Sequence, residues 1–168
     1  MSSDLSICID PEKLSGSGEQ LSGLVNLADL GRLADLITQQ TGDVRYDLTF
    51  ARNEKGNITV TGEIESKLTL ICQRCLCNMT IPVHSDVNIG IVEGENELAE
   101  LEQELDPYQA EKRKISVLKL IEDEILLGLP ISPMHEKVDC PAAESLQEYK
   151  TVKKNPFSVL ETLKREKT

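Results

Sequence analysis

The sequence predicts an α+β fold: a twisted antiparallel β-sheet, built as a meander or a barrel-like sheet, with two or three helices and a short C-terminal helix. Strand-like alternation of apolar and polar residues runs through residues 44–91, and helical spacing appears on either side of it, in residues 26–41 and 115–129. With 168 residues, the chain is long enough to bury its own core. We expect one acidic α+β domain over residues 1–149, followed by a basic linker and an amphipathic helix over residues 150–168.

The first 41 residues predict one short strand and one long helix. Apolar residues alternate over residues 5–9, which is typical of a strand, and the Ser/Gly-rich residues 15–18 predict a loop. From Asn26, a plausible N-cap, apolar residues recur at helical spacing until Thr41 and Gly42 end the helix.

Residues 44–50, 58–70 and 79–91 predict three consecutive strands with one buried and one exposed face. Gly62, inside the longest of them, predicts a bulge or a bend. His84 falls on the exposed face. The second and third strands form a hairpin whose tip contains Cys72 and Cys75.

The second half of the chain begins with an acidic stretch. Residues 93–106 contain seven carboxylates and no basic residue, so we expect a mobile or loosely helical acidic excursion over residues 93–111. Residues 115–129 predict a helix capped by Ser116, with residues 122–124 mainly outward. The last helix is predicted from Asn155, as an N-cap before Pro156.

Charge is divided unevenly along the chain. The net charge is −11, and because residues 150–168 hold six basic and two acidic residues, a net of +4, the remaining residues carry −15. So acidic a body repels nucleic acid and favours basic proteins as partners. Trp is absent and only five Phe and Tyr residues occur, so aromatic platforms for unpaired bases are scarce.

Cysteine usage and hydropathy indicate a reduced, cytoplasmic protein without a membrane partner. There are five cysteines, no apolar leader, and no apolar run long enough to cross a bilayer.

Cys72 and Cys75 form a C-x-x-C pair, the common half of many structural zinc sites. His135 and Cys140, separated by four residues in a Pro-containing loop, could complete a Cys3His tetrahedron. The alternative is four ordinary side chains near one loop. Cys77 could replace His135 as a ligand. A thioredoxin-like redox role is disfavoured, because that chemistry places the pair at a helix start and these flanks are strand-like.

Sequence motifs of common enzyme classes are absent. No G-x-S-x-G, P-loop or H-E-x-x-H pattern occurs, and Gly16 and Gly18 lack the third glycine of a dinucleotide-binding loop. The consecutive carboxylates at 122–124 point in different directions on a helix and cannot converge on one reacting atom. We therefore expect no enzymatic activity.

Three blocks of the sequence resemble the YceD family. They are residues 72–76 (CQRCL), residues 121–130 (IEDEILLGLP) before His135 and Cys140, and residues 155–160 (NPFSVL). The order and spacing of all three blocks match over essentially the whole chain. The resemblance implies a role in ribosome biogenesis, in the synthesis, processing or stability of large-subunit (23S) ribosomal RNA, and it carries over no catalytic residue.

The charge pattern and the resemblance together give one functional hypothesis. The protein is a non-catalytic adapter that binds a basic protein of the large-subunit assembly pathway and is linked to ribosomal RNA indirectly. Partner contacts are expected at Glu122 and Glu124, and at Asn155, Phe157 and Leu160 as a helix-in-groove ligand. The alternatives are a zinc-containing protein that binds RNA directly through the basic tail, and a metal-dependent RNA-processing enzyme.

Overall fold

The computed structural model describes residues 8–94, 101, 105–110 and 114–143. Within these ranges the fold is α+β and mostly sheet. A five-stranded sheet has the order β2-β3-β4-β5-β6, and β1 (Cys8–Ile9) pairs with β7 (Ile115–Ser116) in a separate two-stranded sheet. No helix in these ranges is long and apolar enough to cross a membrane.

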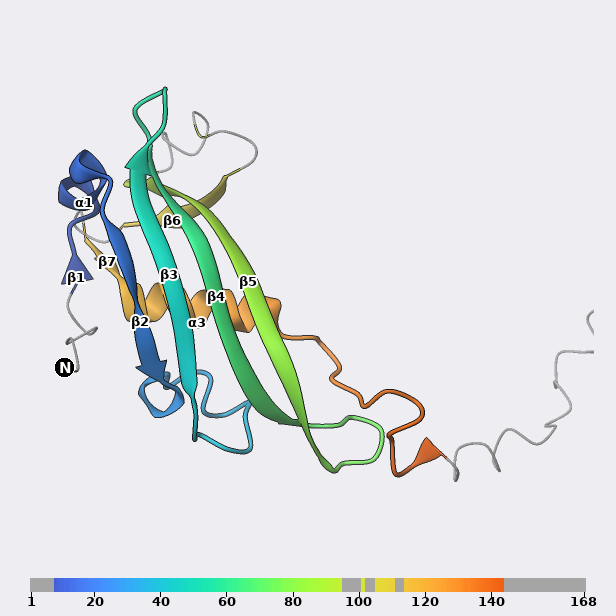
Figure 1. Ribbon diagram of the computed structural model, residues 1–168. Helices are drawn as coiled ribbons and strands as arrows, with labels where there is room; N and C mark the ends of the chain where they lie inside the picture. The colour runs from blue at the N-terminus through green and yellow to red at the C-terminus, as the bar shows by residue number, and fades with distance from the viewer. Residues whose placement is uncertain (1–7, 95–100, 102–104, 111–113, 144–168) are drawn as a thin grey trace, which may run out of the picture.

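The predicted meander is confirmed as the centre of the large sheet (Figure 1). It consists of β3 (Asp43–Arg52), β4 (Ile58–Ile71) and β5 (Asn78–Val92), which pair antiparallel in sequence order. β2 (Gln20–Asn26) adds antiparallel to β3, and β6 (Asp106–Gln109) adds parallel to β5. β2 and β6 do not pair with each other, so the sheet is open and the barrel-like alternative is wrong.

α3 (Val117–Gly128) covers one face of this sheet, and no helix or strand among the described residues covers the other face (Figure 1). α3 is the predicted second helix, and the Ser116 hydroxyl oxygen accepts a hydrogen bond from the Lys119 N–H as its N-cap. The apolar faces of α3 and of the strands form one core that is mostly aliphatic and also contains Tyr46 and Phe50. Among its fully buried members are Leu48, Val60, Ile64, Leu68, Leu120, Ile121 and Ile125.

The expected loop at residues 15–18 is largely helical instead. α1 (Pro11–Ser17) begins after Asp10, whose carboxylate accepts from the Glu12 N–H, and ends at Gly18 with φ +65°. Asp followed by Pro is a helix-start signal, and Gly is the residue that most readily adopts the left-handed terminal conformation. The helix-start signal of Asp10 and Pro11 was therefore present in the sequence, directly after the predicted strand.

The long helix predicted over residues 26–41 is also wrong. Asn26 does act as an N-cap, but of a single 3-10 turn, η1 (Leu27–Asp29). The apolar residues still face the core: Leu27, Leu30, Leu33 and Ile37 are all buried. The backbone over residues 31–36 is a series of turns and not a helix, with isolated helix-type hydrogen bonds from the Ala34 N–H to the Leu30 carbonyl and from the Ile37 N–H to the Leu33 carbonyl.

Glu122 on α3 supplies hydrogen-bond acceptors for backbone N–H groups of this segment. Its carboxylate accepts hydrogen bonds from the backbone N–H groups of Arg32 and Leu33, at 2.6 and 3.2 Å, and from Arg32 Nε at 2.7 Å. Only 7% of Glu122 is exposed. Burial raises the pKa of Glu122, but the hydrogen bonds from Arg32 and Leu33 outweigh it, so the pKa lies below its usual value. The expectation that Glu122 points outward is therefore wrong.

Gly62 sits at a point of close strand contact and not at a bulge. Register is continuous through it, with Leu48 on one side and Val87 on the other. Its φ is +154°, and a Cβ there would collide with the Asp47 carbonyl oxygen. Of the predicted acidic excursion, residues 106–109 form β6, and the other described residues, 93, 94, 101, 105 and 110, belong to neither a helix nor a strand. Residues 95–100, 102–104 and 111 lie outside the described ranges, as does the predicted C-terminal helix.

Candidate metal centre

The β4–β5 hairpin extends beyond the body and ends in a tight turn (Figure 1). The Cys72 N–H donates to the Cys77 carbonyl and the Leu76 N–H to the Cys72 carbonyl, each at 2.9 Å. These bonds fold residues 72–77 so that Cys72 and Cys75 lie on the inside of the turn. The prediction of a C-x-x-C pair at a hairpin tip is confirmed.

Leu76 adopts a left-handed backbone conformation, with φ +60°. This conformation costs a residue with a Cβ roughly 1–2 kcal/mol, and Gly or Asn is its usual occupant. The Leu76 side chain is 74% exposed, so no packing within the described residues offsets the strain.

The loop that follows α3 lies against this turn. The Gln73 N–H donates to the Pro133 carbonyl at 2.8 Å, and the His135 N–H donates to Cys72 Sγ at 3.4 Å. Arg74 contacts the sulfur of Met134 at 3.7 Å. These contacts bring His135 and Cys140 to the C-x-x-C pair from about sixty residues away in the chain.

The four predicted ligands converge. One ligand atom from each of Cys72, Cys75, His135 and Cys140 lies within 4.8 Å of all the others, and Cys75 Sγ is 3.3 Å from His135 Nδ1. Tetrahedral zinc holds sulfur and nitrogen ligands about 3.5–3.8 Å apart, a separation that lies between the 3.3 Å contact and the 4.8 Å limit found in the cluster. Cys72 and Cys140 are buried. The cluster could therefore hold a metal ion, as the sequence predicted.

The pKa values of the two thiols of the C-x-x-C pair are shifted in opposite directions. Burial raises the pKa of Cys72, but N–H groups of Cys75, His135 and Arg74 point at its sulfur and lower the pKa to about 5. Burial raises the pKa of Cys75 to about 11. Thiolate is the form that binds metal, so N–H groups prepare Cys72 as a ligand.

The other cysteines stand apart from this cluster. Cys8 and Cys77 are exposed, and the Cys77 thiol donates to the Cys75 carbonyl at 3.5 Å. The alternative in which Cys77 replaces His135 is not the arrangement observed, because Cys77 is outside the four-residue group.

The open face of the sheet carries a feature that sequence reasoning missed. Asp47, Glu63 and Asp86 are directly opposite one another on β3, β4 and β5, which places three carboxylates in one row. We call these three residues the carboxylate row. Like charges directly opposite are destabilising. The alternation of polar and apolar residues predicts that each of the three lies on the exposed face. Only the strand register shows that they are opposite one another.

A second group of possible ligands lies beside the row. Glu63, Glu65 and His84 could converge on an ion, and all three are exposed. His84 lies 3.7 Å from Glu65 and 3.3 Å from Asp86. The sequence predicted the exposure of His84 but not this grouping, which again depends on register.

The residues predicted to contact a partner are only partly described. Glu122 is buried against Arg32, and Glu124 is half-buried and accepts a hydrogen bond from the Ser85 hydroxyl at 2.8 Å. Asn155, Phe157 and Leu160 lie outside the described residues.

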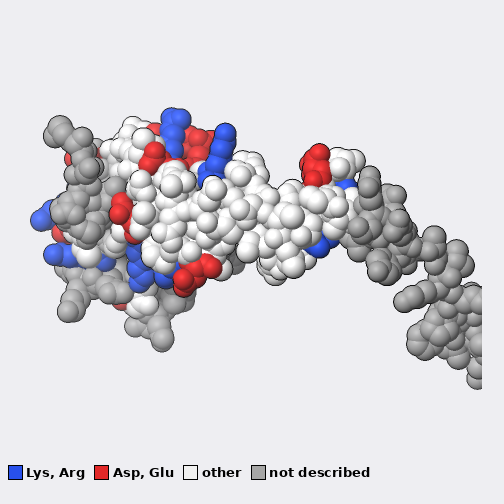
Figure 2. All heavy atoms as spheres, turned by 90° about the horizontal axis from the view of Figure 1, so that it is seen from below, with Lys and Arg blue, Asp and Glu red and all other residues white. Residues whose placement is uncertain are grey.

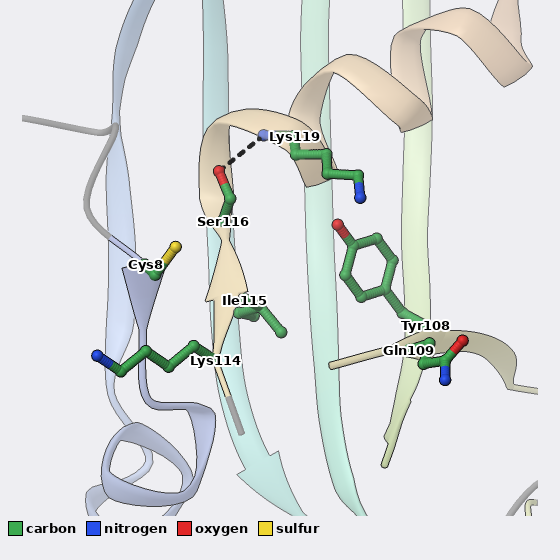
Figure 3. A pocket seen from close by; sticks show the side chains of 7 residues that line it. All are labelled: Cys8, Tyr108, Gln109, Lys114, Ile115, Ser116 and Lys119. Atoms are coloured by element: carbon green, nitrogen blue, oxygen red, sulfur yellow. Dashed lines mark hydrogen bonds between the residues drawn. The ribbon is translucent and has the colours of Figure 1, made fainter. Parts of the chain in front are cut away.

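A cavity of about 330 Å³ lies at the N-terminal end of α3, whereas the cysteine cluster follows its C-terminal end. The cavity is lined by residues of β1, β6, β7 and the first turn of α3 (Figure 3). Its lining includes Lys119 and Tyr108, which approach each other, and Ser116, whose oxygen is used as the N-cap of α3. Lys119 and Tyr108 both take part in interactions within the protein. The cavity offers no group of converging ligands comparable with the cysteine cluster.

Charged side chains are distributed unevenly on the surface (Figure 2). Seen from below, Lys and Arg lie among Asp and Glu on the body, and they do not gather into one positive groove on this face. The arm that carries the cysteine cluster shows few charges of either sign.

Comparisons with known proteins agree on one family. The family described as "Large ribosomal RNA subunit accumulation protein YceD" matches residues 60–164, a range that includes all four residues of the cluster. A protein of Haemophilus influenzae with the same description is 25% identical over 167 residues, covering 95% of this chain and 96% of its own length. No solved structure matches the chain.

Proposed function

The chain belongs to the YceD family of large ribosomal RNA subunit accumulation proteins, and from this premise we propose that it acts in the cytoplasm as a non-catalytic adapter in ribosome biogenesis. It promotes the accumulation of large-subunit (23S) ribosomal RNA by binding a basic protein of the assembly pathway. Its link to RNA is indirect.

The carboxylate row carries this proposal. Three like charges in register on an open sheet face are unfavourable for the isolated protein, and a cationic partner removes the repulsion. The same row repels phosphate, which disfavours direct RNA binding.

A charge-matched pair of variants tests the adapter function in cells. Asp47→Asn/Glu63→Gln/Asp86→Asn removes the row, whereas Asp29→Asn/Asp35→Asn/Glu54→Gln removes three exposed carboxylates elsewhere and gives the same net charge. We expect the first variant, and not the second, to lower the ratio of large-subunit to small-subunit ribosomal RNA. Equal ratios in both would refute a role for the row.

The purified full chain distinguishes the adapter from a direct RNA binder. We expect no submicromolar binding to large-subunit RNA fragments near physiological salt. Tight binding that falls steeply with salt, and that Lys/Arg→Gln changes within residues 150–168 abolish, would instead favour RNA recognition by the basic tail.

For the cysteine cluster, we infer one structural zinc ion bound by Cys72, Cys75, His135 and Cys140. Three thiols and an imidazole are a donor set that zinc prefers, and four protein ligands leave no open position for a water. This closed set disfavours a metal-dependent RNA-processing enzyme. The ion would hold the loop after α3 against the hairpin tip.

Elemental analysis tests the zinc site. We expect about one equivalent of zinc per chain, its loss in Cys72→Ser, and its retention in the matched control Cys77→Ser, because Cys77 lies outside the cluster. Substoichiometric metal in the wild type after growth in zinc-replete medium would contradict the inference.

A further inference from the structure

Exposed large hydrophobic side chains gather at the end of the hairpin arm. Of the eight found within the described residues, five belong to the two segments that form the cysteine cluster. These five residues, which we call the tip surface, are Ile71, Leu76, Ile131, Met134 and Val138. A concentration of exposed apolar side chains on one part of a protein marks a contact surface.

Two members of the tip surface are particularly prominent. Ile131 is fully exposed and Val138 is 86% exposed, although both lie in a loop that is otherwise fixed by hydrogen bonds and by the buried Cys140. Leu76 projects from a left-handed turn that a glycine would form with less strain. A strained backbone that presents an exposed leucine points to a use for that side chain.

The sequence supplies an apolar occupant at short range. The described chain ends at Ala143, three residues beyond Cys140, and therefore at the arm itself. Among the following residues, Phe157, Leu160 and Leu163 are spaced by three, which places them on one side of a helix. Basic residues flank this stretch, at Lys153 and Lys154 before it and at Lys164 and Arg165 after it. Near Val138, Glu136 and Asp139 are exposed together with Lys137.

Tethering makes this occupant strongly favoured over a free competitor. The number of residues between Ala143 and Phe157 corresponds, for a random coil, to an end-to-end distance of roughly 20 Å, which is enough to reach the tip surface. A short tether of this kind gives an effective concentration in the millimolar range. We propose that residues 155–163 pack as an amphipathic helix on the tip surface of their own chain, so that an external partner for either surface must displace them. This inference does not rest on the adapter function.

Hydrogen exchange on the full chain tests the proposal. We expect the amides of residues 155–163 to be protected about tenfold or more in the wild type, and to lose this protection in Leu76→Ser/Val138→Ser. Leu24→Ser is the matched control, because Leu24 is 63% exposed but lies on β2, away from the arm. It should leave the protection unchanged.

Three outcomes would overturn the proposal. Full exchange of residues 155–163 in the wild type would mean that the tail is free, and protection that survives the tip variant would mean that it docks elsewhere. Protection that disappears on dilution would assign the tip surface to a second copy of the chain. Because neither Leu76 nor Val138 is a cluster ligand, unchanged zinc content in the tip variant separates the result from loss of metal.

Discussion

The sheet body and the hairpin tip are stabilised by different means. The body encloses one mostly aliphatic core, to which α3 and the strands of the large sheet contribute side chains. The core runs along the hairpin as far as Leu70 and Met79, and none of its members lies in residues 71–77 or 131–140. At the tip, Cys72 and Cys140 are buried, whereas the large apolar side chains of the tip surface are exposed. The comparison teaches that the body is stabilised by apolar burial, whereas the tip depends on a few directed hydrogen bonds and on a cluster of Cys and His side chains that could hold a metal ion.

Truncating a large, fully buried core side chain should destabilise the body most. Phe50→Ala removes a fully buried aromatic side chain and should lower the free energy of unfolding by about 3–5 kcal/mol. Denaturant titration followed by circular dichroism measures the loss. At low denaturant, where the variant is still folded, zinc content should match the wild type; parallel loss of zinc would show that tip and body are one cooperative unit.

Glu122 should have a smaller, pH-dependent effect on the body. Glu122→Gln weakens the hydrogen bonds that hold the segment at Arg32 and should cost about 1–3 kcal/mol near neutral pH. Since folding lowers the pKa of this carboxyl below 4.5, the stabilisation is complete above that pH and disappears as the pH falls through the folded-state value.

Unfolding measured between pH 3 and 7 checks this sign. Wild-type stability should fall on acidification more steeply than that of Glu122→Gln, and the two curves should approach each other at low pH. Asp35→Asn, at an exposed carboxylate, serves as the control. Parallel curves for the wild type and Glu122→Gln would contradict the assignment.

Removing metal should affect the tip and leave the body nearly unchanged. After chelation, we expect faster amide exchange in residues 72–77 and 131–140, because the loops lose the bonds that cross-link them. The exchange of β3 and β4 should change by less than about threefold, since their protection comes from the core. Melting of the whole sheet on chelation would abolish the distinction between the two regions.

Relieving the strain at Leu76 should have the smallest effect, in the stabilising direction. Leu76→Gly frees the turn from its unfavourable conformation and should tighten zinc binding by about 0.5–1 kcal/mol, measured by competition with a chelator. Leu76→Ala keeps the strain and should leave the affinity unchanged. Weaker binding in the glycine variant would mean that the Leu76 side chain itself supports the metal site.

The sequence predicted correctly those elements whose position depends on a single periodicity, and the cluster whose residue types are typical of metal ligands. Alternation located β3, β4 and β5, and helical spacing with Ser116 located α3. The convergence of the four candidate ligands could be anticipated because few side chains other than Cys and His suit such a site, even from segments sixty residues apart.

The failures have physical reasons as well. Residues 26–41 have helical spacing, but a carboxylate from α3 replaces the helical carbonyls as acceptor for the N–H groups of Arg32 and Leu33. β6 is four residues long and contains a proline, so it has no recognisable alternation. The carboxylate row depends on which residues of three strands are opposite one another, and periodicity does not contain that information.

The β4 strand sets the distance between the carboxylate row and the tip surface, and a partner that contacts both must match that distance. Eight residues of extended chain separate Glu63, in the carboxylate row, from Ile71 at the tip surface, a distance of about 26 Å along the strand. A straight helix needs roughly 17 residues to span it. A shorter cationic helix can therefore bind the carboxylate row or the tip surface, but not both. A protein partner that binds both must present its basic and its apolar surface about 26 Å apart.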